Sequence, residues 1–317
     1  MAISELWAGL FLPLGRIFLF ISLGLILASL IEELGWNRFM SRLALPFIRY
    51  GRFSETSGSG FALAFVSGVS ANTLLAEAYL QGKIERRELL LAHLLNSLPR
   101  FFLHMPTVLF MMLPFIRGAA FLYLGLTFLS ALIRTLLIAL AGRLLLPGGK
   151  PVEPDYPAAR APKFSAALAR AMRRLRRRVG RIMLITAPIY GLFYLADRMG
   201  YFARLGEWLE SNIGFSAFLP PESLGVIVLV AATELTAGLA AAGALLDGNT
   251  LANHEVVLAL LAGTVIAAPI QALRHQVPYY AGIFPPRLAA MLIIYSQLFR
   301  AASVVLVGGI YYLIVCM

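Results

Sequence analysis

Apolar runs long enough to cross a lipid bilayer recur along the chain, and they constrain its fold more than any other feature. The runs Leu10–Ile31, Ala119–Leu146 and Leu288–Val315 each reach the about 20 apolar residues that a crossing helix needs. The 317-residue chain is 60% hydrophobic and only 14% charged, with a mean hydropathy of +0.80. Because a soluble domain carries about 25% charged residues, we expect an all-α polytopic membrane protein.

The positive charge of the chain is concentrated in one segment between apolar runs. Segment 147–181 holds ten basic residues against Glu153 and Asp155, which supplies +8 of the net charge of +11. The positive-inside bias of membrane proteins predicts that this segment lies in the cytoplasm. Its run "ARAMRRLRRRVGR" (169–181) is expected to contact anionic lipid headgroups. This distribution argues against a nucleic-acid partner.

The sequence lacks the motifs of common catalytic and cofactor sites. It contains no P-loop, GxSxG or HExxH motif. The single cysteine, Cys316, rules out a disulfide framework and a cysteine-based metal cluster. We therefore expect no enzyme activity, catalytic residue, metal site or cofactor. The N-terminus also lacks the features of a cleavable signal peptide, so the first apolar run should remain as a membrane helix.

An internal repeat divides the chain into two halves. At a shift of 165 residues, "GRIFLFISLGLILASLIEELGW" (15–36) matches "GRIMLITAPIYGLFYLADRMGY" (180–201). At a shift of 166, "SALIRTLLIALAG" (130–142) matches "SQLFRAASVVLVG" (296–308). Co-linear Gly, Arg and Ser matches at nearly one shift indicate a duplication. The predicted units are a first membrane repeat over 1–146, a basic linker over 147–179 and a second membrane repeat over 180–317.

The charges of equivalent loops predict that the two repeats are inverted relative to each other. "GKIERRE" (82–88) is net positive, whereas its counterpart "DGNTLANHE" (247–255) contains no Lys or Arg. Loop 36–55 is basic, and its counterpart 198–222 is acidic. Opposite charge bias is expected when equivalent loops face opposite sides of the membrane. Each half must then cross the membrane an odd number of times.

One topology in the prokaryotic cytoplasmic (inner) membrane satisfies every loop. It starts outside, and its first half contains a crossing helix at 8–34, a re-entrant hairpin at 58–81, a span at 87–116 broken by Pro99 and Pro106, and a return span at 119–146. The inverted second half uses segments 182–199, 223–246, 255–283 and 288–315, which leaves both termini outside and the linker in the cytoplasm. A straight crossing by 58–81 is the alternative, and it would place "GKIERRE" outside.

Polar residues interrupt each predicted hairpin. "SGVSANTLLAEAYLQGK" (67–83) aligns with "TELTAGLAAAGALLDGN" (233–249), and both carry two hydroxyl residues three positions apart. Non-helical backbone is tolerated at membrane depth only where it is buried in protein or lines a watery cavity. The clusters therefore predict hairpin tips that face a cavity near the midplane. The alternative is that these side chains only help helices to pack.

The broken spans add a further polar layer, because "NSLPRFFLHMP" (96–106) and "APIQALRHQVP" (268–278) both place Arg and His between two prolines. Proline frees backbone carbonyls inside a helix, as in the discontinuous helices of transporter sites. The candidate substrate-binding residues are Ser67, Ser70, Asn72, Thr73, Glu77, Asn96, Arg100, His104, Arg134, Thr233, Glu234, Thr236, Gln271, His275, Gln276 and Arg300.

Arg134 and Arg300 are repeat-equivalent cations within apolar spans, where a charge needs a partner or a cavity. They either pair with Glu77 and Glu234 or face an anionic group of the substrate. The histidines of the broken spans leave a metal role and a proton-coupling role open. The coupling ion, if there is one, would be H⁺ or Na⁺.

The run "SANTLLAEAYLQGKIERRELLLAHLLNSLPRFFLHMPTVLF" (70–110), followed by "LTFLSALIRTLL" (126–137), resembles the nucleoside-recognition, or Gate, domain proteins of prokaryotic membranes. The resemblance implies a fold related to concentrative nucleoside transporters and to the membrane core of ferrous-iron transporters. In the nucleoside transporters, paired re-entrant hairpins and broken helices form the substrate site. The likeness is closest over about 67–140.

These features together predict a secondary transporter for a small polar solute, either anionic or nucleoside-like, that binds near the midplane between two hairpin tips. Two alternatives stay open. The chain could be a non-transporting membrane assembly or partner protein whose hairpins are only structural, or a membrane-embedded enzyme. The expected partners are the lipid bilayer, the solute and anionic headgroups, with a homo-oligomer also possible.

Overall fold

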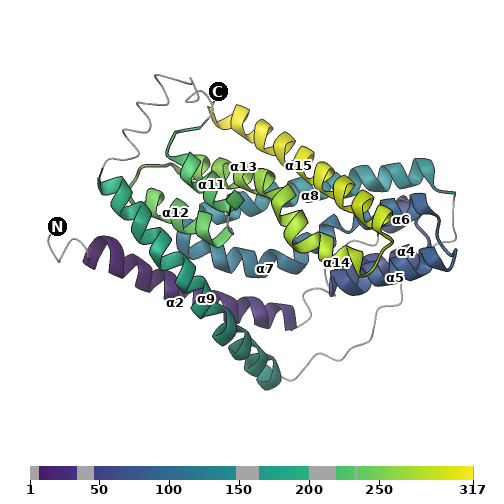
Figure 1. Ribbon diagram of the computed structural model, residues 1–317, viewed down its shortest axis with the longest axis horizontal. Coiled ribbons are helices and arrows are strands. Elements are labelled where there is room, and N and C mark those ends of the chain that lie inside the picture. The colour runs from purple at the N-terminus through teal and green to yellow at the C-terminus, as the bar shows by residue number, and fades with distance from the viewer. Residues whose placement is uncertain (1–6, 34–45, 148–163, 200–218, 233–234, 317) are drawn as a thin grey trace.

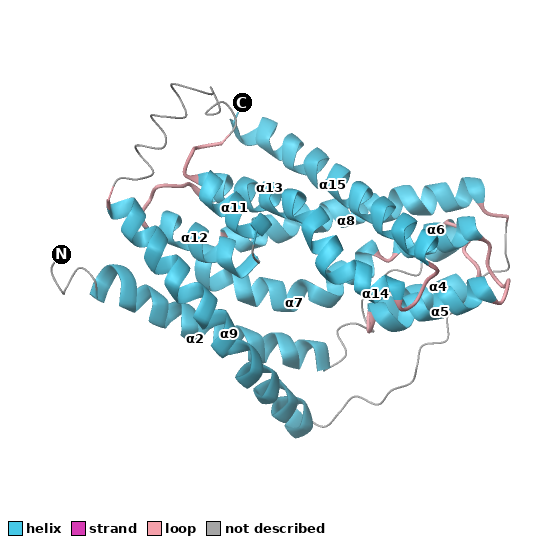
Figure 2. Cartoon of the chain, viewed as in Figure 1, coloured by secondary structure: helices cyan, strands magenta, loops and turns pink. Residues whose placement is uncertain are grey.

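The computed structural model describes residues 7–33, 46–147, 164–199, 219–232 and 235–316, and this part of the chain is helical without any strand (Figures 1 and 2). The elements of the first half are η1 (Trp7–Phe11), α2 (Leu12–Glu33), a short helix at 46–50, α4 (Glu55–Ala64), α5 (Gly68–Leu80), α6 (Arg86–Leu95), α7 (Ser97–Ile116) and α8 (Ala119–Leu145). Those of the second half are α9 (Phe164–Arg198), α11 (Ser223–Ala232), α12 (Leu235–Asp247), α13 (Asn253–Gln271), η3 (Ala272–Gln276), α14 (Val277–Ala281) and α15 (Pro286–Cys316).

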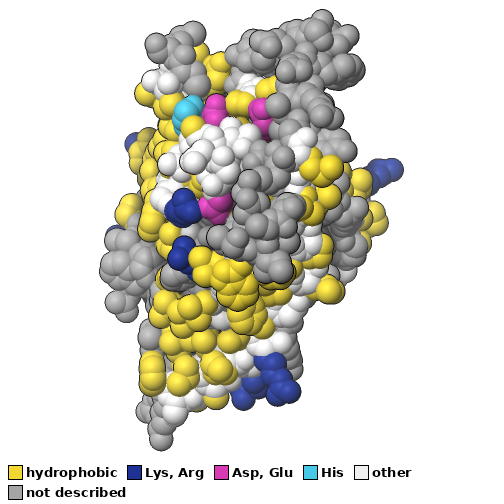
Figure 3. Space-filling model, turned by 90° about the vertical axis from the view of Figure 1, so that its left-hand side faces the viewer, with side chains coloured by type: hydrophobic (Ala, Val, Ile, Leu, Met, Phe, Trp, Pro, Cys, Tyr) yellow, Lys and Arg dark blue, Asp and Glu magenta, His cyan; other side chains and the backbone are white. Residues whose placement is uncertain are grey.

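Four stretches of the described chain are long and apolar enough to cross a membrane. They are Arg86–Ile116, Ala119–Leu145, Asn253–Gln271 and Pro286–Val315. Large apolar side chains also stay exposed along these helices, such as Leu136 on α8 and Leu298 on α15. Where Figure 3 draws described residues, hydrophobic side chains gather over the middle and lower part of this end of the molecule, with charged ones at a few places. An exposed apolar surface of this extent fits contact with lipid rather than with water. The described part of the chain is all-helical, as expected, and its four long apolar helices are compatible with a multi-pass membrane protein.

The first short helix pair, α4 and α5, has side-chain caps at both helix starts. The Ser54 hydroxyl accepts from the backbone N–H of Ser57 at 3.3 Å, and the Ser67 hydroxyl accepts from that of Ser70 at 3.2 Å. Such caps satisfy N–H groups that a helix start leaves unpaired. Glu88 of α6 accepts from the Ser57 hydroxyl at 2.6 Å, which ties the start of α4 to α6. Between the two helices the chain turns at 65–67, where the polar residues of 67–83 begin.

The first broken span is interrupted at Asn96, between α6 and α7. Pro99 follows in the first turn of α7, where a proline is tolerated because the N–H it lacks would be unpaired. The predicted second break at Pro106 is wrong, because α7 continues through Pro106 and Pro114 to Ile116.

The second broken span follows a different local geometry. Helix α13 contains Pro269 and leads into the π-helical turn η3, after which α14 begins. π-Helical turns are rare in proteins, and those that occur inside α-helices are often found at functional sites.

Two apolar clusters, one toward each end of the molecule, combine elements from both halves. The first contains the end of α7 and the start of α8 with much of α11, α12 and α13. The second contains α5, α6 and the end of α8 with α14 and the start of α15. In Figure 1 the pair α4–α5 lies near the right-hand end and the pair α11–α12 near the left-hand end. The run α6–α7 leads from the second cluster to the first, and the run α13–η3–α14 leads from the first to the second.

Helix α9 extends further toward the N-terminus than expected. It begins at Phe164, inside the segment assigned as the linker, and continues without interruption to Arg198. The basic run 169–181 is therefore helical and continuous with the first helix of the second half. Helices α2 and α9 pack together along one side of the molecule (Figure 1).

Candidate anion-binding site

Two cavities lie between the apolar clusters and share three residues in their walls. The first has a volume of about 210 Å³ and the second about 460 Å³. Arg100 and His104 of α7 and Arg300 of α15 line both. The two cavities are therefore neighbouring compartments of one site, here called the arginine compartment and the amide compartment.

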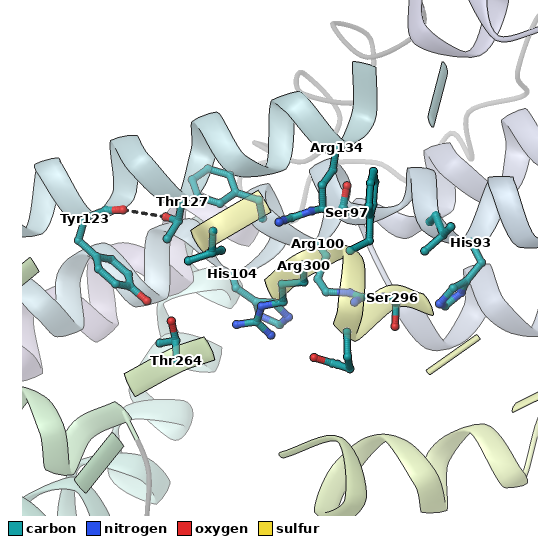
Figure 4. A pocket seen from close by; sticks show the side chains of 15 residues that line it. His93, Ser97, Arg100, His104, Tyr123, Thr127, Arg134, Thr264, Ser296 and Arg300 are labelled. Carbon is teal, nitrogen blue, oxygen red and sulfur yellow. Dashed lines mark hydrogen bonds between the residues drawn. The ribbon is translucent and has the colours of Figure 1, made fainter. Parts of the chain in front are cut away.

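The arginine compartment collects three guanidinium groups from three helices. Arg100 comes from α7, Arg134 from α8 and Arg300 from α15, and Figure 4 shows their side chains gathered at its centre. Arg134 is 9% exposed and donates a hydrogen bond to the hydroxyl of Ser303 on α15. This contact joins the two repeat-equivalent spans through one of their two arginines.

Among the described residues, no Asp or Glu lines either compartment. The one ion pair in the described part of the chain joins Arg117 to Asp247, and neither of these two residues lines a compartment. Three cations near the middle of apolar helices repel one another, and charge at such depth is costly unless a counter-charge compensates it. The electrostatics of the site thus favour the entry of an anion.

Five hydroxyl side chains also line the arginine compartment. They belong to Ser97, Tyr123, Thr127, Thr264 and Ser296. The Thr127 hydroxyl donates to the Tyr123 carbonyl at 2.9 Å, the Thr264 hydroxyl to the Leu261 carbonyl at 2.8 Å, and the Ser296 hydroxyl to the Ile293 carbonyl at 2.9 Å. Each oxygen keeps lone pairs for a further donor, because a hydroxyl is one donor with two acceptor positions.

A buried chain of hydrogen bonds forms one boundary of both compartments. The Nδ1 atom of His93 lies 3.1 Å from Oδ1 of Asn72, and its Nε2 atom lies 3.1 Å from the Tyr280 hydroxyl. All three residues are at most 3% exposed. Asn72 belongs to α5, His93 to α6 and Tyr280 to α14, so the chain links the first short helix pair to the second half.

Two residues that line the amide compartment each have a buried amide oxygen without a hydrogen-bond partner. These oxygens are Oδ1 of Asn96, at the break between α6 and α7, and Oε1 of Gln276, at the end of η3. The Asn96 residue is only 4% exposed. A third such oxygen, Oε1 of Gln297, belongs to the arginine compartment. The two helix breaks thus place residues with unpaired acceptors in the wall of one cavity, one from each half.

The structure brings half of the sequence-predicted site residues to these compartments. The predicted residues that line them are Ser67, Asn72, Asn96, Arg100, His104, Arg134, Gln276 and Arg300. They lie at the turn of the first helix pair, at or near the two helix breaks, and, for Arg134 and Arg300, within long apolar helices.

Other predicted residues lie elsewhere. Ser70 is exposed, and its hydroxyl donates to that of Ser67 at 3.0 Å, while the Thr73 hydroxyl donates to the Val69 carbonyl at 3.0 Å. Glu77 is exposed and lines a separate cavity with Glu55 and Lys83, so it forms no ion pair with Arg134.

In the second half, Gln271 and Thr236 line neither compartment, although the buried Thr236 hydroxyl also has no partner. Thr233 and Glu234 lie outside the described residues, so the predicted pairing of Arg300 with Glu234 is outside them too. His275 belongs to η3, and its side chain is not described.

Sequence reasoning missed His93, Tyr280 and the hydroxyls of α8, α13 and α15. His93 lies in "LLLAHLL" (89–95), where one polar residue among leucines carries little signal. Ser296 could have been found, because it aligns with Ser130 at the repeat shift of 166.

Comparison with known proteins adds relatives of similar length. The chain is 24% identical to the uncharacterized protein MJ1556 of Methanocaldococcus jannaschii over 291 residues, which cover 91% of this chain and 89% of the relative. It is 20% identical to the uncharacterized protein MJ0871 of the same archaeon over 279 residues, covering 88% and 86%. No protein-family model matches the chain, and no solved structure is significantly similar to it.

Proposed function

We propose that this protein is a secondary transporter of a small anionic solute, which binds in the arginine compartment between the two apolar clusters. The observation that carries the proposal is the set of Arg100, Arg134 and Arg300 around one cavity that no described Asp or Glu lines. Planar guanidinium groups suit carboxylate and phosphate oxygens, because they offer paired donors in a fixed geometry.

The arrangement of elements supports transport rather than binding alone. In both halves a long helix is followed by a short helix pair, a broken span and a final long helix. The two broken spans run in opposite directions between the clusters. We interpret the halves as inverted repeats and the short pairs as re-entrant hairpins, consistent with the resemblance to Gate domain proteins. Rocking of two such units around a fixed midplane site is a common form of alternating access.

This proposal includes an orientation and a location. The protein lies in the prokaryotic cytoplasmic membrane with the basic segment 147–181 in the cytoplasm and both termini outside, as the positive-inside bias favours. Anionic lipid headgroups contact the basic run of α9. Transport is driven by an H⁺ or Na⁺ gradient or by exchange of one anion for another.

The first test is anion binding to the purified full-length protein. We expect at least one member of a panel of small carboxylates and phosphates to raise the Tm in a saturable way, because a ligand that binds only the folded state stabilises it. Arg134→Gln and Arg300→Gln should each abolish that rise. Arg143→Gln is the matched control, because Arg143 also lies on α8 but packs over the ring of Tyr50, outside both compartments.

The second test separates a transporter from an assembly protein or a membrane-embedded enzyme. Protein reconstituted into liposomes loaded with the stabilising anion should take up labelled anion from outside and release it unchanged. An assembly protein would show no Arg134-dependent binding, and an enzyme would return a chemically altered product. Either result, or binding without any exchange across the bilayer, would contradict the proposal.

A further inference from the structure

The amide compartment carries information about the ligand beyond its charge. Asn96 from the first half of the chain and Gln276 from the second line it, and the buried amide oxygen of each has no protein partner. A buried acceptor that stays unpaired costs free energy, and native structures contain few of them. Two residues with such acceptors in the wall of one cavity therefore favour a ligand that donates hydrogen bonds to them once their side chains turn toward it.

The chemistry of the two compartments differs. The arginine compartment has three arginines and five hydroxyl side chains beside the one amide of Gln297, whereas the amide compartment has two of those arginines, two amides without a partner for their oxygens, and apolar groups such as Ala64, Val69 and Leu103. Arg100 and Arg300 stand at the boundary of the two. A single molecule could thus place an acidic group on one side of that boundary and an uncharged body on the other.

Size supports an occupant larger than an inorganic anion. The compartments have volumes of about 210 and 460 Å³, and pockets for organic ligands typically fall between about 300 and 1,000 Å³. A phosphate or sulfate ion alone would leave the amide compartment and its unpaired oxygens unused.

We infer that the substrate is an organic anion with two parts, an acidic head held by the arginines and an uncharged body whose O–H or N–H groups donate to Asn96 and Gln276. This inference rests on the proposed function, because it assigns the arginine compartment to the acidic head. It adds a specificity rule, in which the two amides select hydroxylated or amine-bearing anions over apolar anions of the same charge.

Matched pairs of probes test this rule by isothermal titration of the purified full-length protein, with heats into protein-free micelles subtracted. Gluconate and hexanoate share a carbon chain length and a carboxylate, and glycerol 3-phosphate and propyl phosphate share a carbon chain length and a phosphate. In at least one pair the hydroxylated member should bind about tenfold more tightly or better, because an unpaired polar site strongly rejects a ligand that lacks the matching group. The two pairs distinguish a carboxylate head from a phosphate head.

Variants then locate the source of the preference. Gln276→Leu should remove most of the preference within the pair while leaving the Kd of its apolar member within about twofold, since only the hydrogen bonds to the body are lost. Asn96→Leu gives a second, independent variant from the other half. Thr236→Val is the matched control, because it deletes another buried unpaired oxygen that lines neither compartment.

Each outcome decides between the proposals. Equal binding within both pairs, with affinity still lost in Arg134→Gln, would overturn the two-part substrate and leave the anion site standing. An equal loss for both members of a pair in Gln276→Leu would show that the amide is structural and would also overturn the inference. No Arg134-dependent binding of any probe would remove the proposed function together with the inference.

Discussion

The imidazole of His93 uses both ring nitrogens in the hydrogen-bond chain that joins α5, α6 and α14. Asn72 offers an oxygen at 3.1 Å from Nδ1, so Nδ1 carries the proton and Nε2 accepts from the Tyr280 hydroxyl at 3.1 Å. A neutral ring with this tautomer satisfies both nitrogens. Its edge-to-face contact with the Tyr280 ring, with centroids 5.4 Å apart, holds the same geometry by packing.

Tyr280→Phe should destabilise the protein by about 1–3 kcal/mol, because the ring packing stays while a buried acceptor loses its donor. Thermal or denaturant unfolding of the purified protein measures the change. Tyr295→Phe on α15 is the control, because Tyr295 is 50% exposed and should change stability by less than about 0.5 kcal/mol. Equal effects of the two variants would show that the hydrogen bond to His93 contributes nothing.

The surroundings of Arg134 predict that removing its charge does not lower the stability of the ligand-free protein. Its guanidinium donates to Ser303 and faces Arg100 and Arg300 across the cavity, with no described carboxylate beside it. Arg134→Gln should therefore keep or raise the ligand-free Tm while it abolishes anion binding, since it removes an uncompensated buried charge.

The double variant with Glu77→Gln is the decisive comparison. Because Glu77 is exposed in a separate cavity, the second change should alter neither the Tm nor the binding seen in Arg134→Gln. A loss of stability in Arg134→Gln that Glu77→Gln restores would instead reveal an ion pair between the two residues.

At the scale of single residues, the sequence points to site residues whose polarity is unusual for the apolar segment that contains them. Arg134 and Arg300 stand out as charges in apolar spans, and Asn96 and Gln276 stand out beside prolines. The role of Ser67 was harder to anticipate, because a serine before a helix can serve as a cap, a ligand or both. It caps α5 and also lines the amide compartment. The Tyr280 contact with His93 depends on long-range packing, which a single sequence does not encode locally.

At the scale of elements, close backbone approach fixes how α8 meets the turn before α4. A Cβ added at Gly142 would lie 2.5 Å from the Gly51 carbonyl oxygen, closer than atoms can pack. Gly142→Ala should therefore force the turn away from α8 and cost about 1–3 kcal/mol, as overpacking of a close-packed interior does. The measurement is the Tm of the purified variant.

Gly125→Ala provides the matched control on the same helix. A Cβ at Gly125 meets no atom within 4 Å, and Ala favours a helix over Gly by about 1 kcal/mol. This variant should be neutral or slightly stabilising. A similar loss of Tm in both variants would mean that helix α8 tolerates no added methyl group anywhere, rather than that Gly142 is a specific contact.

Element boundaries followed from the sequence where apolar length and turn residues agree. The span predicted at 119–146 corresponds to α8, Ala119–Leu145, and the hairpin at 58–81 corresponds to α4 and α5. Proline was a poorer guide. Pro106 lies inside α7, whereas the actual interruptions fall at Asn96 and in the π-helical turn η3. Neighbouring side chains can satisfy the backbone groups that a proline frees, so its position alone does not locate a break.

At the scale of the whole molecule, the polar site lies where the two apolar clusters meet. The spans α8 and α15 each contribute to both clusters and carry Arg134 and Arg300 between those contributions. A displacement of one cluster against the other would change the shape of both compartments. This geometry gives the proposed transport cycle a physical basis, because the ligand would contact both moving parts at once.

The proposed inversion makes its strongest prediction about two equivalent turns. Lys83 lies between α5 and α6, and Asn253 begins α13 directly after the corresponding turn; both are exposed. In a Cys316→Ser background, Lys83→Cys should react with a membrane-impermeant maleimide only from the cytoplasmic side, and Asn253→Cys only from the outside. Vesicles of both orientations from the expressing cells allow the comparison.

Leu136→Cys serves as the control for access through lipid, because Leu136 is 50% exposed on the apolar face of α8 and should react from neither side. The two turns are equivalent in the repeat, so the expected opposite labelling depends on each half crossing the membrane an odd number of times. Labelling of Lys83→Cys and Asn253→Cys from the same side would require a parallel duplication. The short helix pairs would then cross the membrane fully, and the oppositely directed spans α6–α7 and α13–η3–α14 would need another explanation.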